Sequence, residues 1–228
     1  MDGNGRWAKK RALPHEMGHR AGVESLRAII RECGKLGVEV LTVYGFSTEN
    51  WSRPQEEVSA LMSLMLKCFR DELDELHKSN VRIRVIGDLA GLPEAQRIEA
   101  QRDMRITERN TGLQLNLALN YGGRDELVRA AKSIAHDAAN GKLAPDEIDE
   151  TSFAARLDTA GQPDVDLLIR TSGEMRTSNF LPYQTAYAEF IVTDTLWPDF
   201  KETQLHDALE SYWIRSRRFG GRTKETER

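Results

Sequence analysis

Cysteine and long apolar runs are both scarce in this 228-residue chain, and each scarcity excludes a class of protein. There are two cysteines and no CxxC motif, which excludes a disulfide framework and fits a reducing cytoplasm. Cys33 and Cys68 lie among apolar residues at helical spacing, so both are expected in the core. No apolar run approaches the ~20 residues of a membrane span, and no signal peptide is evident, so the sequence predicts a soluble, cytoplasmic protein without a transmembrane segment.

An excess of positive charge is also lacking. The formal net charge is −4 at pH 7, which argues against a nucleic-acid-binding protein because such proteins usually carry a basic field. The basic residues nevertheless gather towards the two ends of the chain, as Lys9, Lys10, Arg11 and Arg20 and as Arg215, Arg217, Arg218 and Arg222. Local basic clusters in an acidic protein indicate a small anionic ligand.

Several familiar catalytic and phosphate-binding motifs are missing. There is no GxxxxGK[ST] and no GxGxxG after a predicted strand, which disfavours nucleotide hydrolysis and dinucleotide binding. The segment GEMRTSNF lacks the G-x-S-x-G pattern of a nucleophile elbow. His15 and His19 are four residues apart but have no HExxH or cysteine partner, so a zinc site is not expected.

Predicted strands and helices alternate along the chain. We expect strands at 38–46, 81–87, 113–120, 165–171 and 189–194. We expect helices at 20–36, 54–79, 93–109, 124–140 and 202–217, with a short helical stretch near 145–157. Alternation of this kind predicts an α/β fold with a mainly parallel central sheet flanked by helices. No linker or repeat is evident, so residues 1–228 are expected to form a single domain.

The first seven residues, MDGNGRW, combine groups that suit a phosphate and metal site. Asp2 is a hard oxygen ligand appropriate for Mg²⁺, and Arg6 offers a planar fork for phosphate oxygens. Gly3 and Gly5 let backbone N–H groups approach a ligand closely. The alternative is a flexible, solvated tail, and these residues alone do not decide between the two.

Polar segments that follow the predicted strands favour the first interpretation. The segments 47–54, 121–124 and 170–180 would all open on one rim of a parallel sheet, where ligands of such folds bind. Arg53, Arg170 and Arg176 would therefore converge with Arg6 to form a phosphate or diphosphate site. A surface ion pair is the alternative for each arginine taken alone.

An apolar stripe on the predicted helix 54–79 provides a surface for a hydrophobic part of a ligand. The stripe recurs at helical spacing as Leu61, Leu64, Met65 and Cys68. Such a stripe is ordinarily part of the core, but beside a diphosphate site it could instead wall an apolar cleft.

Seven segments, in order, resemble the cis-prenyltransferase family, and in particular the bacterial undecaprenyl diphosphate synthases, which are isoprenyl transferases. They are MDGNGRWA (1–8), GHRAG (18–22), YGFSTENWSRP (44–54), NYGGR (120–124), IRTSGEMRTSNFLPYQTAYAE (169–189), WPDF (197–200) and RRFGG (217–221). The resemblance implies an α/β fold with an apolar channel, and addition of isopentenyl diphosphate to an allylic diphosphate such as farnesyl diphosphate. The expected product is a long polyprenyl diphosphate, a membrane lipid carrier for cell-wall glycans.

The resemblance also implies roles for individual residues. Asp2 is similar to the Mg²⁺-associated acidic residue beside the departing diphosphate, with Glu189 assisting the metal, and Asn50 is similar to a residue that helps to deprotonate the isopentenyl unit. The residues expected to bind substrate are Gly3, Asn4, Gly5, Arg6, Trp7, His15, His19, Ser47, Thr48, Glu49, Trp51, Arg53, Arg170, Arg176, Thr177 and Ser178. The stripe on 54–79 would line the channel, with Leu113 toward its closed end. The segment Arg218-Phe219-Gly220 resembles one that reaches the neighbouring subunit, which implies a homodimer.

The sequence departs from the family pattern at two places. His15 stands where the family usually has an arginine, so diphosphate binding is expected to be weaker or pH-sensitive. The family's MDGN usually follows an apolar strand, whereas here it begins at residue 1, so we expect that a short N-terminal strand is missing.

Two alternatives to the catalytic interpretation can be weighed on the residues. The absence of any Asp-Asp pair excludes the DDxxD motif of the trans-prenyltransferases. A non-catalytic subunit of a two-component prenyltransferase is expected to lose the polar residues of the first motif, yet Asp2, Asn4 and Arg6 are all present. A generic phosphate-binding module would explain the arginines but not the seven segments.

Overall fold

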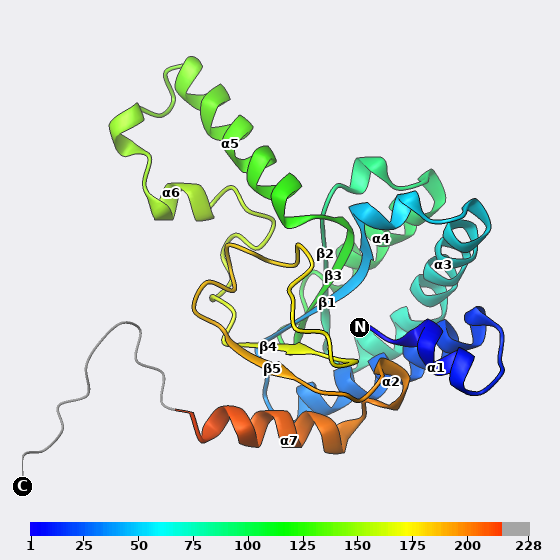
Figure 1. Ribbon diagram of the computed structural model, residues 1–228. Coiled ribbons are helices and arrows are strands. Elements are labelled where there is room, and N and C mark those ends of the chain that lie inside the picture. Colours follow the sequence, from blue (N-terminus) through cyan, green and yellow to red (C-terminus); the bar gives the residue numbers. More distant parts are fainter. Residues whose placement is uncertain (216–228) are drawn as a thin grey trace, which may run out of the picture.

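The computed structural model describes residues 1–215 (Figure 1). Its strands are β1 (Val40–Ser47), β2 (Arg82–Ile86), β3 (Gln114–Tyr121), β4 (Leu167–Arg170) and β5 (Glu189–Val192). Its α-helices are α1 (Asn4–Lys10), α2 (His15–Lys35), α3 (Gln55–Lys78), α4 (Glu94–Thr107), α5 (Gly123–Ala139), α6 (Glu150–Ala154) and α7 (Glu202–Trp213). Short 3₁₀ turns include η1 (Thr48–Ser52) after β1 and η4 (Trp197–Asp199) before α7. No helix within residues 1–215 has both the length and the apolar character that crossing a membrane requires.

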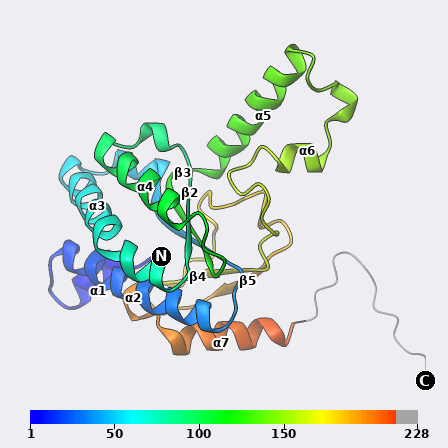
Figure 2. The same cartoon turned by 180° about the vertical axis from the view of Figure 1, so that it is seen from behind.

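The strands pair in parallel, which confirms the predicted α/β class, but they form two sheets. The larger sheet has the order β1-β3-β2, with Val43 opposite Leu117 and Leu117 opposite Val85. The smaller sheet pairs β4 with β5, and Leu167 lies opposite Glu189. Helices lie on both sides of the larger sheet, with α2 and α7 on one side and α3 and α4 on the other (Figures 1 and 2).

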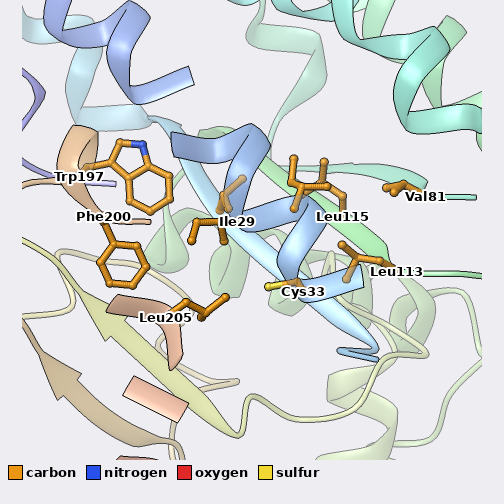
Figure 3. Close-up of a cluster of buried hydrophobic side chains, with 10 residues drawn as sticks. Ile29, Cys33, Val81, Leu113, Leu115, Trp197, Phe200 and Leu205 are labelled. Carbon is orange, nitrogen blue, oxygen red and sulfur yellow. The ribbon is translucent and has the colours of Figure 1, made fainter. Parts of the chain in front are cut away.

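The first core cluster joins the larger sheet to α2 and α7. It comprises Ile29, Ile30, Cys33, Val43, Val81, Leu113, Leu115, Trp197, Phe200 and Leu205 (Figure 3). Leu115 in the central strand is 1% exposed, and Cys33 is buried as predicted. Fully burying one such side chain contributes about 1.5–3 kcal/mol, so this cluster fixes the larger sheet against α2 and α7.

The second core cluster lies between the larger sheet and the helices α3 and α4. On α3 the deeply buried positions are Val58, Met62, Phe69 and Leu73. The predicted stripe of Leu61, Leu64, Met65 and Cys68 is half-buried, and Leu61 and Met65 pack against this cluster, so the stripe lies at the margin of the core. Cys68 is free, like Cys33, and burial raises the pKa of its thiol to about 11. The half-buried face of α3 leaves the expected apolar channel as a prediction.

The helices differ from the predicted ranges mainly near the two ends of the chain. Helix α1 was not predicted, because Gly3, Asn4 and Gly5 are poor helix formers. Helix α2 begins at His15 instead of residue 20, directly after Pro14, whose position before the first turn suits a helix start. Helix α7 ends at Trp213, and the predicted continuation to residue 217 lies partly outside the described residues.

Helix α5 projects away from the rest of the molecule and packs with α6 (Figures 1 and 2). Its base is fixed by Glu126, which is 1% exposed. The Glu126 carboxylate accepts hydrogen bonds from the Tyr121 hydroxyl at 2.6 Å and from the Asp158 backbone N–H at 2.8 Å. Gln184 donates to the same carboxylate. This buried carboxylate thus ties α5 to the end of β3 and to the segments on either side of β4.

Candidate active site

The backbone of Asp2 is fixed beside the carboxyl end of β4. Its N–H donates to the Thr171 hydroxyl at 3.0 Å, although the two residues are 169 positions apart. Its carbonyl accepts hydrogen bonds from the hydroxyls of Thr171 and Ser172, at 2.9 and 2.7 Å, and from the Trp197 N–H at 2.9 Å. A segment held by this many long-range hydrogen bonds is not a flexible tail, so that alternative is excluded.

The carboxylate of Asp2 lies between two guanidinium groups. Arg170 donates to Oδ2 at 2.9 Å, and Arg6 lies 3.5 Å from Oδ1, which also accepts the Gly3 N–H at 2.8 Å. Partial burial alone would raise the pKa of this carboxyl group, but the hydrogen bond and charge of Arg170, the charge of Arg6 and the Gly3 N–H together lower it. Asp2 is therefore held in its charged form.

Glycines allow α1 to begin immediately after Asp2. Gly3 has φ +105°, and a Cβ there would lie 2.2 Å from the Ser172 hydroxyl oxygen, so this position requires glycine. A Cβ on Gly5 would lie 2.8 Å from Cε1 of His15, which places the His15 ring against this backbone. Residues 4–6 form the first turn of α1, where backbone N–H groups have no acceptor within the helix.

The side chain of Asn4 does not face the other site residues. The Asn4 Oδ1 would lie 2.6 Å from a Cβ on Gly22. This oxygen is buried without a hydrogen-bond partner. The Asn4 carbonyl would likewise lie 2.1 Å from a Cβ on Gly18. The amide oxygen of Asn4 thus packs against α2, and the expected contact of Asn4 with substrate stays a prediction.

Two of the predicted arginines contact Glu174, and a third contacts one of those two. Arg6 Nη2 lies 3.0 Å from Glu174 Oε1, and Arg176 forms an ion pair with Oε2 of the same carboxylate. Arg170 donates to the Arg176 carbonyl at 2.8 Å, in addition to its bond with Asp2. The Nε of Arg170 is buried without a hydrogen-bond partner. These arginines come from α1, β4 and the following loop, and each of them is paired with Asp2 or Glu174.

The loop after β1, which belongs to the larger sheet, contacts the loop after β4. The Asn50 amide oxygen accepts the Ser47 N–H at 3.0 Å, which fixes the turn η1. Thr48 donates to Glu49 at 3.3 Å, and Asn179 donates to the same carboxylate at 2.8 Å. Burial would raise the pKa of Glu49, but the Asn179 hydrogen bond and others outweigh it and lower the value.

The loop after β4 meets the loop after β1 at a shared cavity. A cavity of about 270 Å³ is lined by Glu49, Arg124, Thr177, Asn179 and Pro182. Thr177 and the neighbouring Ser178, which has φ +49°, are both exposed. The predicted residues of the two loops therefore come together, although they are far apart in the sequence.

The predicted aromatic and histidine residues occupy the margins of the site. Trp51 donates to Asn120 at 2.7 Å, and Trp7 donates to Asp199 at 2.7 Å, so both indoles are fixed by the scaffold. Arg53 pairs with Glu57 at 2.9 Å, which is the ordinary ion pair that the sequence left open. Burial, helped by the charge of Arg53, lowers the pKa of His19.

Glu189 is not brought to Asp2 within this chain. It is the first residue of β5 and lies opposite Leu167, whereas Asp2 contacts Arg170 and the residues that follow it at the other end of β4. The Glu189 carboxylate instead accepts a hydrogen bond from Arg215 at 2.8 Å. Glu189 thus lies at the opposite end of β4 from Asp2, and its expected assistance to the metal stays a prediction.

The remaining donor set suits a magnesium ion that shares its coordination with a substrate. No group of three or more His, Cys, Asp or Glu side chains that could hold a metal occurs within residues 1–215. Asp2 offers a single, partly exposed carboxylate. Mg²⁺ is commonly bound by one or two carboxylates together with substrate phosphates, so Asp2 beside a diphosphate fits this ion.

Three residues of the site were not singled out from the sequence. Thr171 and Ser172 anchor Asp2, and Glu174 joins two arginines. The available signal was their position in RTSGEMR, directly after a strand and between two arginines. The predicted Arg218-Phe219-Gly220 segment lies outside the described residues.

Comparison with known proteins places most of the chain in one family. Residues 1–220 match a family described as putative undecaprenyl diphosphate synthase. An isoprenyl transferase of Clostridium perfringens (strain 13 / Type A) is 53% identical over 221 residues, which cover 97% of this chain and 87% of that protein.

Two solved structures share the fold. Lavandulyl diphosphate synthase from Lavandula x intermedia, solved in complex with dimethylallyl diphosphate, is 39% identical with a TM-score of 0.94, covering 96% of this chain and 95% of its own. A probable undecaprenyl diphosphate synthase from Campylobacter jejuni is 33% identical with a TM-score of 0.78, covering 88% of this chain and 92% of its own.

Proposed function

The chain belongs to the undecaprenyl diphosphate synthase family of isoprenyl transferases, and from this premise we propose which reaction its site performs. The protein condenses isopentenyl diphosphate with an allylic diphosphate, farnesyl diphosphate being the expected primer. Repeated condensation with cis geometry gives a long polyprenyl diphosphate. We propose that this product is undecaprenyl diphosphate, which serves in the membrane as a carrier for cell-wall glycans.

The observation that carries the proposal is the position of Asp2 between Arg6 and Arg170 at the carboxyl end of β4. Arg6 would bind the allylic diphosphate with the first-turn N–H groups of α1, and Arg170 and Arg176 would bind isopentenyl diphosphate. The structure of lavandulyl diphosphate synthase with dimethylallyl diphosphate supports a prenyl diphosphate as the ligand of such a fold.

Each condensation breaks the C–O bond between the allylic carbon and its diphosphate and forms a carbon–carbon bond to the isopentenyl unit, which then loses a proton. Donors aimed at the departing diphosphate stabilise the charge that develops on it. Asn50, fixed by the Ser47 N–H, would position the isopentenyl unit for loss of that proton. The half-buried face of α3, with Leu61, Leu64 and Met65, would exclude water from the allylic cation and line the channel.

A magnesium ion would be held by Asp2 together with the diphosphate. When bound, Mg²⁺ neutralises charge on the departing diphosphate and so favours its release. Arg170 keeps the Asp2 carboxylate charged and oriented in readiness for the ion.

The assembly and the place of action are further parts of the proposal. Trp213 is 77% exposed and Ile214 is 80% exposed at the end of α7, which supports burial of this end in a homodimer. We propose that each subunit is one domain, acts in the cytoplasm and releases its product to the membrane.

The first experiment measures incorporation of labelled isopentenyl diphosphate onto farnesyl diphosphate, with and without Mg²⁺, in wild type and Asp2→Ala. Products are separated by length. Mg²⁺-dependent long products that vanish in Asp2→Ala are expected, and their length identifies the product. A folded wild-type protein that forms no product under any condition would contradict the proposal and favour a non-catalytic subunit.

A further inference from the structure

Glu174 occupies a position that the proposed reaction does not use. It lies in the loop after β4, and its two carboxylate oxygens face two different arginines. Oε1 is 3.0 Å from Nη2 of Arg6, and Oε2 pairs with Nη1 of Arg176. Under the proposed function, Arg6 belongs to the allylic diphosphate subsite and Arg176 to the isopentenyl diphosphate subsite, so one carboxylate bridges both.

This bridging uses the same donors that a diphosphate needs. The Glu174 side chain is 22% exposed, so its charge is only partly screened by water. The other terminal nitrogen of Arg6 already donates to the Ser172 carbonyl at 3.2 Å. A diphosphate that approaches either arginine therefore meets a carboxylate that has to leave, because two anions cannot share the donors without strong repulsion.

We propose that Glu174 is an internal anion that takes the place of the substrate diphosphates in the empty site and couples the binding of the two substrates. The inference rests on the proposed function, since it assigns the two arginines to two diphosphates. The first diphosphate to bind displaces the carboxylate and thereby frees the arginine of the other subsite. The second diphosphate then binds more tightly, which is a positive coupling between two ligands.

The local backbone permits this exchange without disturbing the core. Ser172 and Gly173 are fixed, because their N–H groups donate to the carbonyls of Thr195 and Thr193 at 3.0 and 2.9 Å. Beyond them the chain is open to solvent, and Met175 is 80% exposed. Rotation of the Glu174 side chain can thus release both arginines while the loop keeps its place. Glu174 acts through these arginines and is a positioning residue.

The test is the binding of inorganic pyrophosphate, measured by calorimetry without Mg²⁺ and at fixed ionic strength. Glu174→Gln keeps the shape of the side chain and removes its charge. We expect the dissociation constant to fall by roughly tenfold, within the usual range of coupling between two ligand sites. Glu174→Asp keeps the charge and should stay close to wild type.

Glu99 offers a matched control for the loss of a bridging carboxylate. It also joins two arginines, accepting from Arg70 at 2.9 Å and Arg102 at 3.1 Å, but it does so on the surface of α3 and α4. Glu99→Gln should leave pyrophosphate binding unchanged.

In steady-state assays, Glu174→Gln should lower the KM for both substrates without raising kcat, because Glu174 contacts one arginine of each subsite.

Pyrophosphate binding by Glu174→Gln that equals wild type, or is weaker, would overturn the inference while leaving the proposed function intact. Weaker binding would mean that the carboxylate mainly holds the arginines in place. Absence of pyrophosphate binding in wild type and in every variant would instead overturn the diphosphate site, and the inference with it. Thermal unfolding of each variant verifies that the compared proteins are folded.

Discussion

The sheet β1-β3-β2 and the sheet β4-β5 are both parallel, but different interactions hold them in place. Most residues of the central strand β3 are buried, and apolar clusters cover the sheet on two sides. All four residues of β5 are only half-buried, and Arg170 at the end of β4 engages Asp2 and the Arg176 carbonyl. The larger sheet is stabilised by apolar burial, whereas the end of the smaller sheet is organised by charges and hydrogen bonds.

This difference separates a scaffold from a site. The larger sheet is held by apolar packing, which is non-directional and leaves no place for charged side chains. This sheet therefore positions the loops around the site but contributes few functional groups. The end of β4 holds several polar groups that satisfy one another in the empty protein, and the same groups are available to an anionic ligand. Substitutions in the two sheets should therefore have opposite consequences for stability and activity.

The largest expected effect is on activity, from Arg170→Lys. Lysine keeps the charge but lacks the planar fork, so it cannot hold Asp2 and the Arg176 carbonyl together. We expect kcat/KM to fall by roughly 10²–10³-fold, comparable to the loss of one donor to a developing anion. Arg156→Lys, which affects a pair with Asp137 of α5, serves as the control. An unchanged kcat/KM in Arg170→Lys would contradict a functional role for this end of β4.

The reverse effect is expected from Leu115→Ala in the larger sheet. This side chain is 1% exposed, and its truncation leaves a cavity, so the free energy of unfolding should fall by about 3 kcal/mol. Activity per folded molecule should stay near wild type, which urea denaturation and assays on the same sample can establish together. Leu36→Ala is the control because Leu36 is 45% exposed. Equal losses in the two variants would contradict the assignment of Leu115 to the core.

A moderate gain is expected from His15→Arg. The His15 ring lies against Gly5, at the start of α1, and a guanidinium there would add a charged fork for phosphate oxygens. Pyrophosphate affinity should rise by roughly tenfold, as for other charge-assisted pairs. Calorimetry of this variant beside His136→Arg, which places the same change on α5, separates a local effect from a general effect of charge. Equal gains in both variants would indicate a general effect.

The smallest expected effect is the pH dependence of stability caused by His19. Burial and the charge of Arg53 lower its pKa below the ordinary value of 6.5, so the folded protein resists taking up a proton that the unfolded chain accepts. Stability should therefore decrease as the pH falls through 6.5, until the folded form is protonated as well. Denaturation curves from pH 8 to pH 5 should show a smaller decrease for His19→Gln. Parallel pH profiles for the two proteins would exclude this contribution.

The strands and the arginine cluster were predictable because their signals are local. The apolar runs that became β1, β2 and β3 define buried strands, and polar segments after parallel strands must share one rim. Arg170 and Arg176 follow from that rule, and the structure brings them together with Arg6, whereas Arg53, which was also expected there, pairs with Glu57.

Other features depend on contacts that no local pattern contains. The direction of the Asn4 side chain is decided by the close approach of α2 at Gly18 and Gly22. The separation of Glu189 from Asp2 follows from the register of β5 against β4, which the composition of a short strand does not encode. Glu174 was not predictable as a site residue, because a lone carboxylate between two arginines usually forms a surface ion pair.

The projection of α5 and α6 has a practical consequence for anyone who wishes to label this protein. Their connection begins after Ala139, at the far end of α5 (Figure 1). Gly141 in this connection is exposed, has φ +67° and has open space around it. Exposed loop tips of this kind accept inserted peptides readily. A fluorophore or affinity tag introduced between Asn140 and Lys142 would lie in solvent and would not contact either sheet.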